Sequence, residues 1–160
     1  MERAITFAII TCSDTRTKEE DTAGALLQEC IAAHESWSVV SYELVKDERA
    51  DIAAAIIRAA DGSDAQIILT CGGTGLSLRD VTPEATADVC DRDVPGIAEA
   101  MRAHSLAITG RAMLSRARCM QRGAHIIINL PGSKKAALEN WECIEGQIDH
   151  MVSMMTGEGH

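Results

Sequence analysis

Aromatic residues are scarce in this sequence, which has one Phe, one Tyr and two Trp among 160 residues. Because 46% of the residues are nonetheless hydrophobic, the core has to be built from Ala, Ile, Leu, Val and Met, which suits a layered α/β domain. No apolar run approaches the length of a membrane span, and residues 1–3 lead into a strand pattern rather than a signal peptide. We therefore expect a cytoplasmic protein with no membrane partner.

Positive charge is also in short supply, with 15 Lys and Arg against 24 Asp and Glu and a net charge of −9. Binding to the phosphate backbone of nucleic acids relies on clustered Lys and Arg, so the composition argues against a nucleic-acid partner. A small anionic ligand would have to be bound by local groups.

The six cysteines and five histidines lack the spacing of metal ligands. There is no CxxC pair and no close cluster of Cys and His, which argues against a zinc site. We interpret the cysteines as small reduced thiols. Cys12 and Cys71 end predicted strands, so either could line a pocket without being a nucleophile.

Glycine is concentrated in one stretch, Gly72-Gly73-Thr74-Gly75. It follows the apolar run Ala65 to Leu69, which predicts a strand buried on both faces. Three glycines in four residues allow positive φ and let bare N–H groups approach a ligand, most naturally phosphate. Thr82 is the expected N-cap of the next helix, with Pro83 at its first position, so Asp80 falls in the loop. A tight turn without a ligand is the alternative.

Two further loops are expected at the same edge of the sheet. Ser13 and Asp14 follow the predicted strand Ile5 to Thr11, and Asp47 follows the predicted strand Trp37 to Val45. Ligands of doubly wound sheets bind beyond the carboxyl ends of the strands, so these side chains should lie near the glycine stretch. On local grounds alone, Asp47 could instead cap the helix that follows it.

A second possible anion site begins at Ser133, after the predicted strand His125 to Leu130. Ser133 as an N-cap would leave free N–H groups at a helix N-terminus, next to Lys134 and Lys135. The alternative is an ordinary capped helix with solvated lysines. The strand should also form a hairpin with Arg118 to Gln121 at one edge of the sheet.

The glycine spacing fits neither the Rossmann fingerprint nor a Walker A loop. Gly72-Gly73-Thr74-Gly75, followed by Arg79-Asp80 and Thr82-Pro83-Glu84, instead resembles the signature of the MoaB/MogA family of molybdenum cofactor biosynthesis proteins. The family's LPGSxKA string is matched by Leu130 to Ala136, and its VxD context by Val45-Lys46-Asp47. The resemblance covers nearly the whole chain.

Length and the alternation of strand and helix signals predict one domain, residues 1–160, with a mostly parallel sheet between helices in three α/β/α layers. An antiparallel hairpin should form its edge, and residues 151–160 are expected to be a flexible tail. The resemblance implies a homotrimer, with a homohexamer as the other possibility.

The resemblance also implies an activity, the Mg²⁺-dependent adenylylation of molybdopterin by ATP with release of pyrophosphate. Phosphates that carry like charges need a divalent metal between them, and carboxylates are its usual protein ligands. The implied catalytic and Mg²⁺-binding residues are Asp47 and Asp80. The nucleotide phosphates would contact Ser13, Asp14, Gly72, Gly73, Thr74 and Gly75, and the pterin would contact Pro131, Gly132, Ser133 and Lys135.

The sequence is also compatible with two other functions. One is a non-catalytic molybdopterin carrier or scaffold, which would bind the pterin without turning over ATP. The other is a dinucleotide pyrophosphatase-like enzyme on the same fold, which would hydrolyse a dinucleotide without any pterin.

Overall fold

The computed structural model describes residues 3–158. In this part of the chain, six strands form one sheet in the order β2-β1-β3-β6-β5-β4. The strands β2, β1, β3 and β6 are parallel, whereas β5 is antiparallel to β6 and β4 is antiparallel to β5. Their bounds are β1 (Ile5–Cys12), β2 (Trp37–Val45), β3 (Ile67–Cys71), β4 (Arg92–Asp93), β5 (Cys119–Arg122) and β6 (His125–Leu130).

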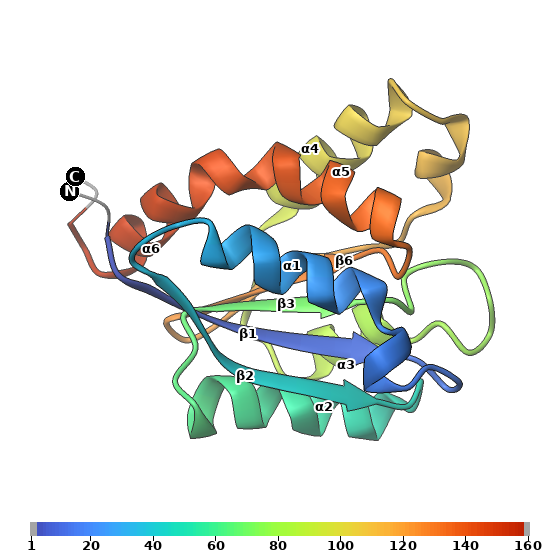
Figure 1. Cartoon of the computed structure of the whole chain (residues 1–160), viewed down its shortest axis with the longest axis horizontal. Helices are drawn as coiled ribbons and strands as arrows, with labels where there is room; N and C mark the ends of the chain where they lie inside the picture. The colour runs from blue at the N-terminus through green and yellow to red at the C-terminus, as the bar shows by residue number, and fades with distance from the viewer. Residues whose placement is uncertain (1–2, 159–160) are drawn as a thin grey trace.

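Helices cover both faces of this sheet (Figure 1). On one face lie α1 (Thr22–Ala32), α4 (Pro95–Leu106) and α5 (Lys134–Ile144), and α6 (Ile148–Met155) continues beyond α5; on the other face lie α2 (Arg49–Ile57) and α3 (Thr82–Asp88). Short helical turns occur at Lys18–Glu20 (η1), Arg58–Gly62 (η2), Gly110–Leu114 (η3) and Glu145–Gln147 (η4). The predicted three-layer α/β/α fold is thus confirmed. No helix in residues 3–158 has the length and apolarity needed to cross a membrane.

Strand β1 shows how the sheet divides the core. Its side chains alternate, so that Phe7 and Ile9 join the cluster under α1 and α5, while Ala8 and Ile10 join the cluster over α2. The few aromatic rings gather in the first cluster, where Phe7 lies 5.3 Å from Trp37 and 6.1 Å from Trp141 between ring centroids. Small Ala side chains fill much of the other cluster.

Strand β3 is displaced toward its carboxyl end relative to the predicted Ala65 to Leu69. It pairs with β1 and β6 through Cys71, and the hydroxyl of its buried Thr70 accepts a hydrogen bond from Asn129 Nδ2 at 3.0 Å. Because this partner lies 59 residues away, the apolar pattern alone could not show that Thr70 continues the strand. The displacement brings the end of β3 directly to Gly72.

The hairpin β5-β6 was predicted correctly, and it lies at the antiparallel edge of the sheet with one further short strand outside it. The outermost strand is β4, which pairs with β5 through Arg92 opposite Gln121. A strand of two residues carries no period for sequence analysis to detect.

The first residues of the tail predicted at 151–160 are helical. Residues 151–155 continue α6, and Val152 is 1% exposed because it packs into the core beneath α1 and α5. Gly159 and His160, which also belong to that predicted tail, lie outside the described residues.

Candidate functional site

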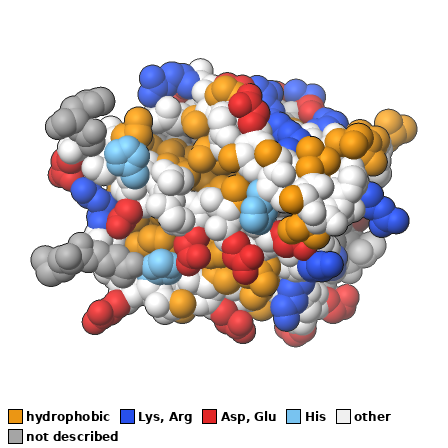
Figure 2. All heavy atoms as spheres, turned by 90° about the horizontal axis from the view of Figure 1, so that it is seen from above, with side chains coloured by type: hydrophobic (Ala, Val, Ile, Leu, Met, Phe, Trp, Pro, Cys, Tyr) orange, Lys and Arg blue, Asp and Glu red, His pale blue; other side chains and the backbone are white. Residues whose placement is uncertain are grey.

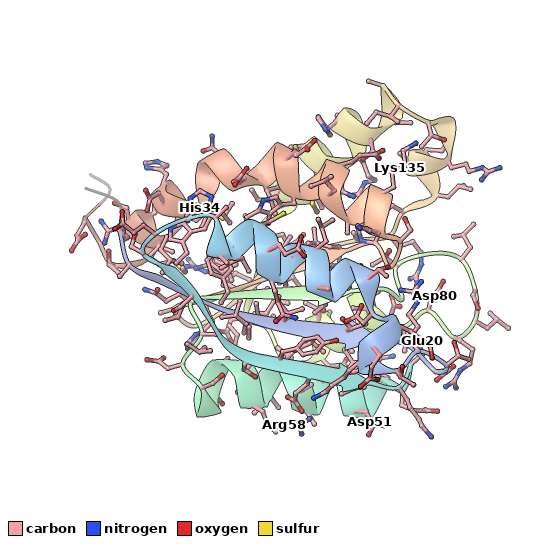
Figure 3. The ribbon with its side chains drawn as sticks, in the orientation of Figure 1. Glu20, His34, Asp51, Arg58, Asp80 and Lys135 are labelled. Carbon is pink, nitrogen blue, oxygen red and sulfur yellow. The ribbon has the colours of Figure 1, made fainter. Side chains whose placement is uncertain are left out.

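The loops that follow β1, β2, β3 and β6 meet at one edge because these four strands are parallel (Figure 1). Asp80 lies at this edge, beyond the arrowheads of the strands, whereas His34 lies at the opposite end of the molecule (Figure 3). Arg16 joins two of these loops, since its Nη1 donates to the carbonyl oxygen of Gly132 at 2.7 Å. Sequence analysis thus placed the loops correctly but missed Arg16.

Position 72 needs a glycine because the backbone of Cys12 packs closely against it. Its φ is +98°, and a Cβ there would lie 2.6 Å from the carbonyl oxygen of Cys12. Its N–H donates to the carbonyl oxygen of Leu130 at 3.0 Å. This amide is therefore committed to the fold, and only the later amides of the stretch are left to face a ligand.

Gly73 and Gly75 each leave space beside a carboxylate. At Gly73, where φ is +70°, a Cβ would lie 3.4 Å from Asp47 Oδ1. At Gly75, a Cβ would lie 2.9 Å from Asp80 Oδ2, and φ is not positive. The expectation of positive φ thus holds for the first two glycines, while Gly75 is needed for its proximity to Asp80.

Asp14 and Asp47 hold the loops after β1 and β2 together. The amide of Asp14 donates to Asp47 Oδ2, and the amide of Asp47 donates to Asp14 Oδ1, both at 3.1 Å. The other oxygen of Asp47, Oδ1, is buried without a hydrogen-bond partner. Burial raises the pKa of Asp47, and the charges of Asp14 and Asp80 act in the same direction.

Arg79 pairs with Asp14 and makes no hydrogen bond to the carboxylates of Asp47 or Asp80. Its Nε and Nη2 each donate to the carboxylate of Asp14 at 3.0 Å, and Nη2 also contacts Glu48 Oε1 at 2.9 Å. The hydrogen bond from Arg79 lowers the pKa of Asp14. Within residues 3–158, the carboxylate of Asp80 has no hydrogen bond or ion pair, and the buried Asp47 Oδ1 also lacks a partner.

Thr82 does not cap α3 as predicted, because Val81 occupies the N-cap position, Thr82 the first helical position and Pro83 the second. Its hydroxyl is buried without a hydrogen-bond partner and faces the vacant Cβ position of Gly73 at 2.2 Å. Nearby Cys12 has a pKa of about 12 because burial disfavours the thiolate. A buried thiol with a raised pKa carries little thiolate at neutral pH.

A cavity of about 340 Å³ opens beside the glycine stretch, between α4, η3 and α5. Thr74 and Gly75 line it from one side and Pro131 from another. Its remaining polar groups come from Arg102, Ser105, Thr109, Arg111, Ser115, Asn129, Glu139 and Asn140.

The four residues after β6 that were predicted to contact the pterin lie in different surroundings. Pro131 lines the cavity, whereas Gly132 packs against Gly72, at 3.2 Å between the vacant Cβ position and Cα. Ser133 caps α5 as predicted, accepting from the amide of Ala136 at 3.3 Å. Lys135 is exposed near the start of that helix (Figure 3).

Charge on the face formed by α1 and α5 is mixed. Lys and Arg side chains lie in separate groups interspersed with Asp and Glu, and hydrophobic side chains show between them (Figure 2).

The fold and the loops define a class of protein, the three-layer α/β domains with ligand loops at the carboxyl edge of a parallel sheet. Residues 8–150 match the family described as "Probable molybdopterin binding domain". The chain belongs to this family, which contains the MoaB and MogA proteins.

Relatives and solved structures agree with that assignment. The chain is 36% identical to "Molybdopterin adenylyltransferase" of Helicobacter pylori (strain J99), over 97% of this chain and 90% of that protein. It is also 36% identical to "Molybdenum cofactor synthesis protein cinnamon" of Drosophila melanogaster, where it covers 95% of its own length but 26% of the fly protein. The structure of the molybdopterin biosynthesis enzyme MoaB from Thermus thermophilus superposes with a TM-score of 0.87 at 41% identity, covering 96% of this chain and 97% of that one.

Proposed function

We propose that this protein is a cytoplasmic molybdopterin adenylyltransferase, in which the terminal phosphate of molybdopterin attacks the α-phosphorus of ATP and pyrophosphate leaves. One observation carries the proposal. The glycine stretch has a carboxylate oxygen without a hydrogen-bond partner at either end, the buried Asp47 Oδ1 beside Gly73 and Asp80 Oδ2 beside Gly75. The name of the Helicobacter pylori relative supports the same activity.

Each group of residues has a part in this proposal. The amides of Gly73, Thr74 and Gly75 would donate to the nucleotide phosphates, and the loop of Ser13 and Asp14 would border them. The cavity lined by Thr74, Gly75 and Pro131 would receive the pterin, so that its phosphate approaches the glycine stretch. Gly132, Ser133 and Lys135 would border that entrance, with the exposed Lys135 attracting the anionic substrate.

The donor set fits Mg²⁺. Asp47 and Asp80 supply hard carboxylate oxygens, and a buried carboxylate oxygen without a partner is stabilised by a cation. Within residues 3–158, no group of three or more His, Cys, Asp or Glu could hold a metal ion, so the proposed Mg²⁺ would be held by one or two carboxylates together with substrate phosphates. When bound, Mg²⁺ would neutralise the phosphate charge that otherwise repels the pterin phosphate.

The pterin phosphate needs little help from a base, because a phosphate monoester is largely ionised near neutral pH. The protein's task is therefore to position two anions and to balance their charge.

The proposal includes one domain spanning residues 1–160 and assembly of the chain into a homotrimer.

Turnover with purified protein, molybdopterin, ATP and Mg²⁺ tests the proposal. We expect adenylyl-molybdopterin and pyrophosphate in equal amounts. Binding of molybdopterin without consumption of ATP would instead identify a carrier, and hydrolysis of a dinucleotide without pterin would identify the pyrophosphatase-like alternative.

A further inference from the structure

Arg116 joins the two ends of the loop that carries Asp80. It follows η3, and it lies 36 residues from Asp80 in the sequence. Its Nε donates to the carbonyl oxygen of Gly75 at 2.8 Å, and its Nη2 donates to the carbonyl oxygen of Asp80 at 2.6 Å. One guanidinium thus binds the residue that begins the loop and the residue that presents the carboxylate.

Two further contacts fix Arg116 itself. Its Nη1 donates to Glu84 Oε2 at 2.7 Å, in the first turn of α3. Its backbone amide donates to the carbonyl oxygen of Thr74 at 2.8 Å. All three guanidinium nitrogens are therefore engaged, and the side chain is held at both ends.

We infer that Arg116 is a positioning residue that holds the Asp80 carboxylate beside Gly75. The inference rests on the proposed function, because it concerns the carboxylate assigned there to Mg²⁺ and ATP. Drawing the two carbonyl groups to one guanidinium fixes the distance between Gly75 and Asp80, where the space for a Cβ is filled by Asp80 Oδ2 at 2.9 Å. The role depends on a planar fork of donors, which Arg has and Lys lacks.

The loop needs such an anchor because its tip makes little contact with the domain. Leu78 is 98% exposed and Leu76 is 64% exposed. The anchor on its other side is the ion pairing of Arg79 with Asp14 and Glu48, in which the Arg79 side chain is 54% exposed. Exposed pairs of this kind are weakened by salt, whereas the Arg116 side chain is 35% exposed and binds backbone carbonyls.

The test compares Arg116→Lys and Arg116→Ala with Arg118→Lys as the matched control. Arg118 is the next arginine along the chain, and its guanidinium faces Asp93 at 3.7 Å, away from the loop. Amide hydrogen exchange at Asp80, whose N–H donates to the carbonyl oxygen of Ser77 at 2.9 Å, reports the order of the loop without substrate. Binding of Mn²⁺-ATP, measured by electron paramagnetic resonance, reports the metal site without turnover.

We expect both Arg116 variants to exchange the Asp80 amide faster, to bind Mn²⁺-ATP more weakly, and to adenylylate molybdopterin with a kcat lowered about a hundredfold at unchanged KM for the pterin. Arg116→Lys should resemble Arg116→Ala, because charge without the fork does not join the two carbonyls. Arg118→Lys should match the wild type in all three measurements.

Wild-type exchange and wild-type kcat in Arg116→Lys would overturn the inference, as would faster exchange with unchanged Mn²⁺-ATP binding and kcat, which would mark Arg116 as merely structural. If Arg116→Ala does not fold, Arg116→Lys decides. If the wild type forms no adenylyl-molybdopterin, the proposed function fails, and the exchange and Mn²⁺-ATP measurements then decide the role of Arg116 separately.

Discussion

Asp14 and Asp47 each accept a hydrogen bond from the other's backbone amide, at 3.1 Å in both directions, yet their pKa values are shifted oppositely. The difference has a plain cause. Arg79 pairs with Asp14, which lowers its pKa, whereas Asp47 is partly buried near two other carboxylates, which raises its pKa. The charge of Asp14 is thus balanced by Arg79, whereas the charge of Asp47 has no such partner at the site.

Stability should therefore respond oppositely to the two Asn variants. A raised pKa in the folded state means that folded Asp47 binds protons more readily than unfolded Asp47, so its contribution to stability falls as pH rises through that window. In metal-free protein at neutral pH, Asp47→Asn should unfold at a higher temperature than wild type. The gain should vanish in acid, where the carboxyl is protonated in both states.

Asp14→Asn is the matched comparison and should lose stability at neutral pH, because its depressed pKa marks a charge that the fold favours. Thermal unfolding from neutral to acid pH checks both signs. A loss of stability in Asp47→Asn at neutral pH would contradict the view that Asp47 is an uncompensated charge.

Gly73→Ala should destabilise the protein more than Gly123→Ala does. Both residues have positive φ, +70° and +55°, so each replacement costs about 1–2 kcal/mol of backbone strain. A methyl group at Gly123 meets open space, whereas at Gly73 it would lie 2.2 Å from Thr82 Oγ1. Denaturant unfolding measures the difference, and equal losses would show that the space at Gly73 is not needed.

Gly75→Val should abolish ATP binding while leaving a folded protein, because the added side chain occupies the place of Asp80 Oδ2 and the phosphate space. Gly110→Val serves as the control, since a Cβ there meets nothing within 4 Å. Calorimetric titration with ATP and Mg²⁺ measures both. Unchanged ATP affinity in folded Gly75→Val would show that the glycine stretch is a turn that does not bind the nucleotide phosphates.

The chain should assemble at micromolar concentration, as the proposed homotrimer requires. Large apolar side chains are exposed near the site, among them Leu78 at 98%, Met113 at 67% and Leu114 at 49%. Light scattering should give a mass three times the 17.1 kDa of one chain, or six times for paired trimers. A mass near 17.1 kDa at all concentrations would exclude the homotrimer.

The sequence predicted features that depend on neighbours along the chain. The strand ending at Val45, the capping of α5 by Ser133 and the hairpin around Gly123 are local patterns, and the structure confirms them. The carboxyl-edge loops followed from the parallel sheet. The resemblance, and not the local pattern, singled out Asp47 and Asp80.

The features that sequence analysis missed depend on partners distant in the chain. Arg116 reaches Gly75 across 41 residues, and Arg16 reaches Gly132 across 116. The end of β3 depends on Asn129, and the edge strand β4 exists because β5 lies beside it. No spacing rule connects such residues, because their proximity results from the folded sheet.

The most direct test of the central claim is the single-turnover rate of adenylyl-molybdopterin formation in wild type, Asp47→Asn and Asp80→Asn across a Mg²⁺ series. If these carboxylates act as the bonds rearrange, each variant should lose roughly a hundredfold to a thousandfold in rate, about 3 to 4 kcal/mol, with little change in molybdopterin binding. Raised Mg²⁺ should restore part of the rate if the carboxylates recruit the ion. Wild-type rates in both variants, or no product from the wild type, would contradict the account.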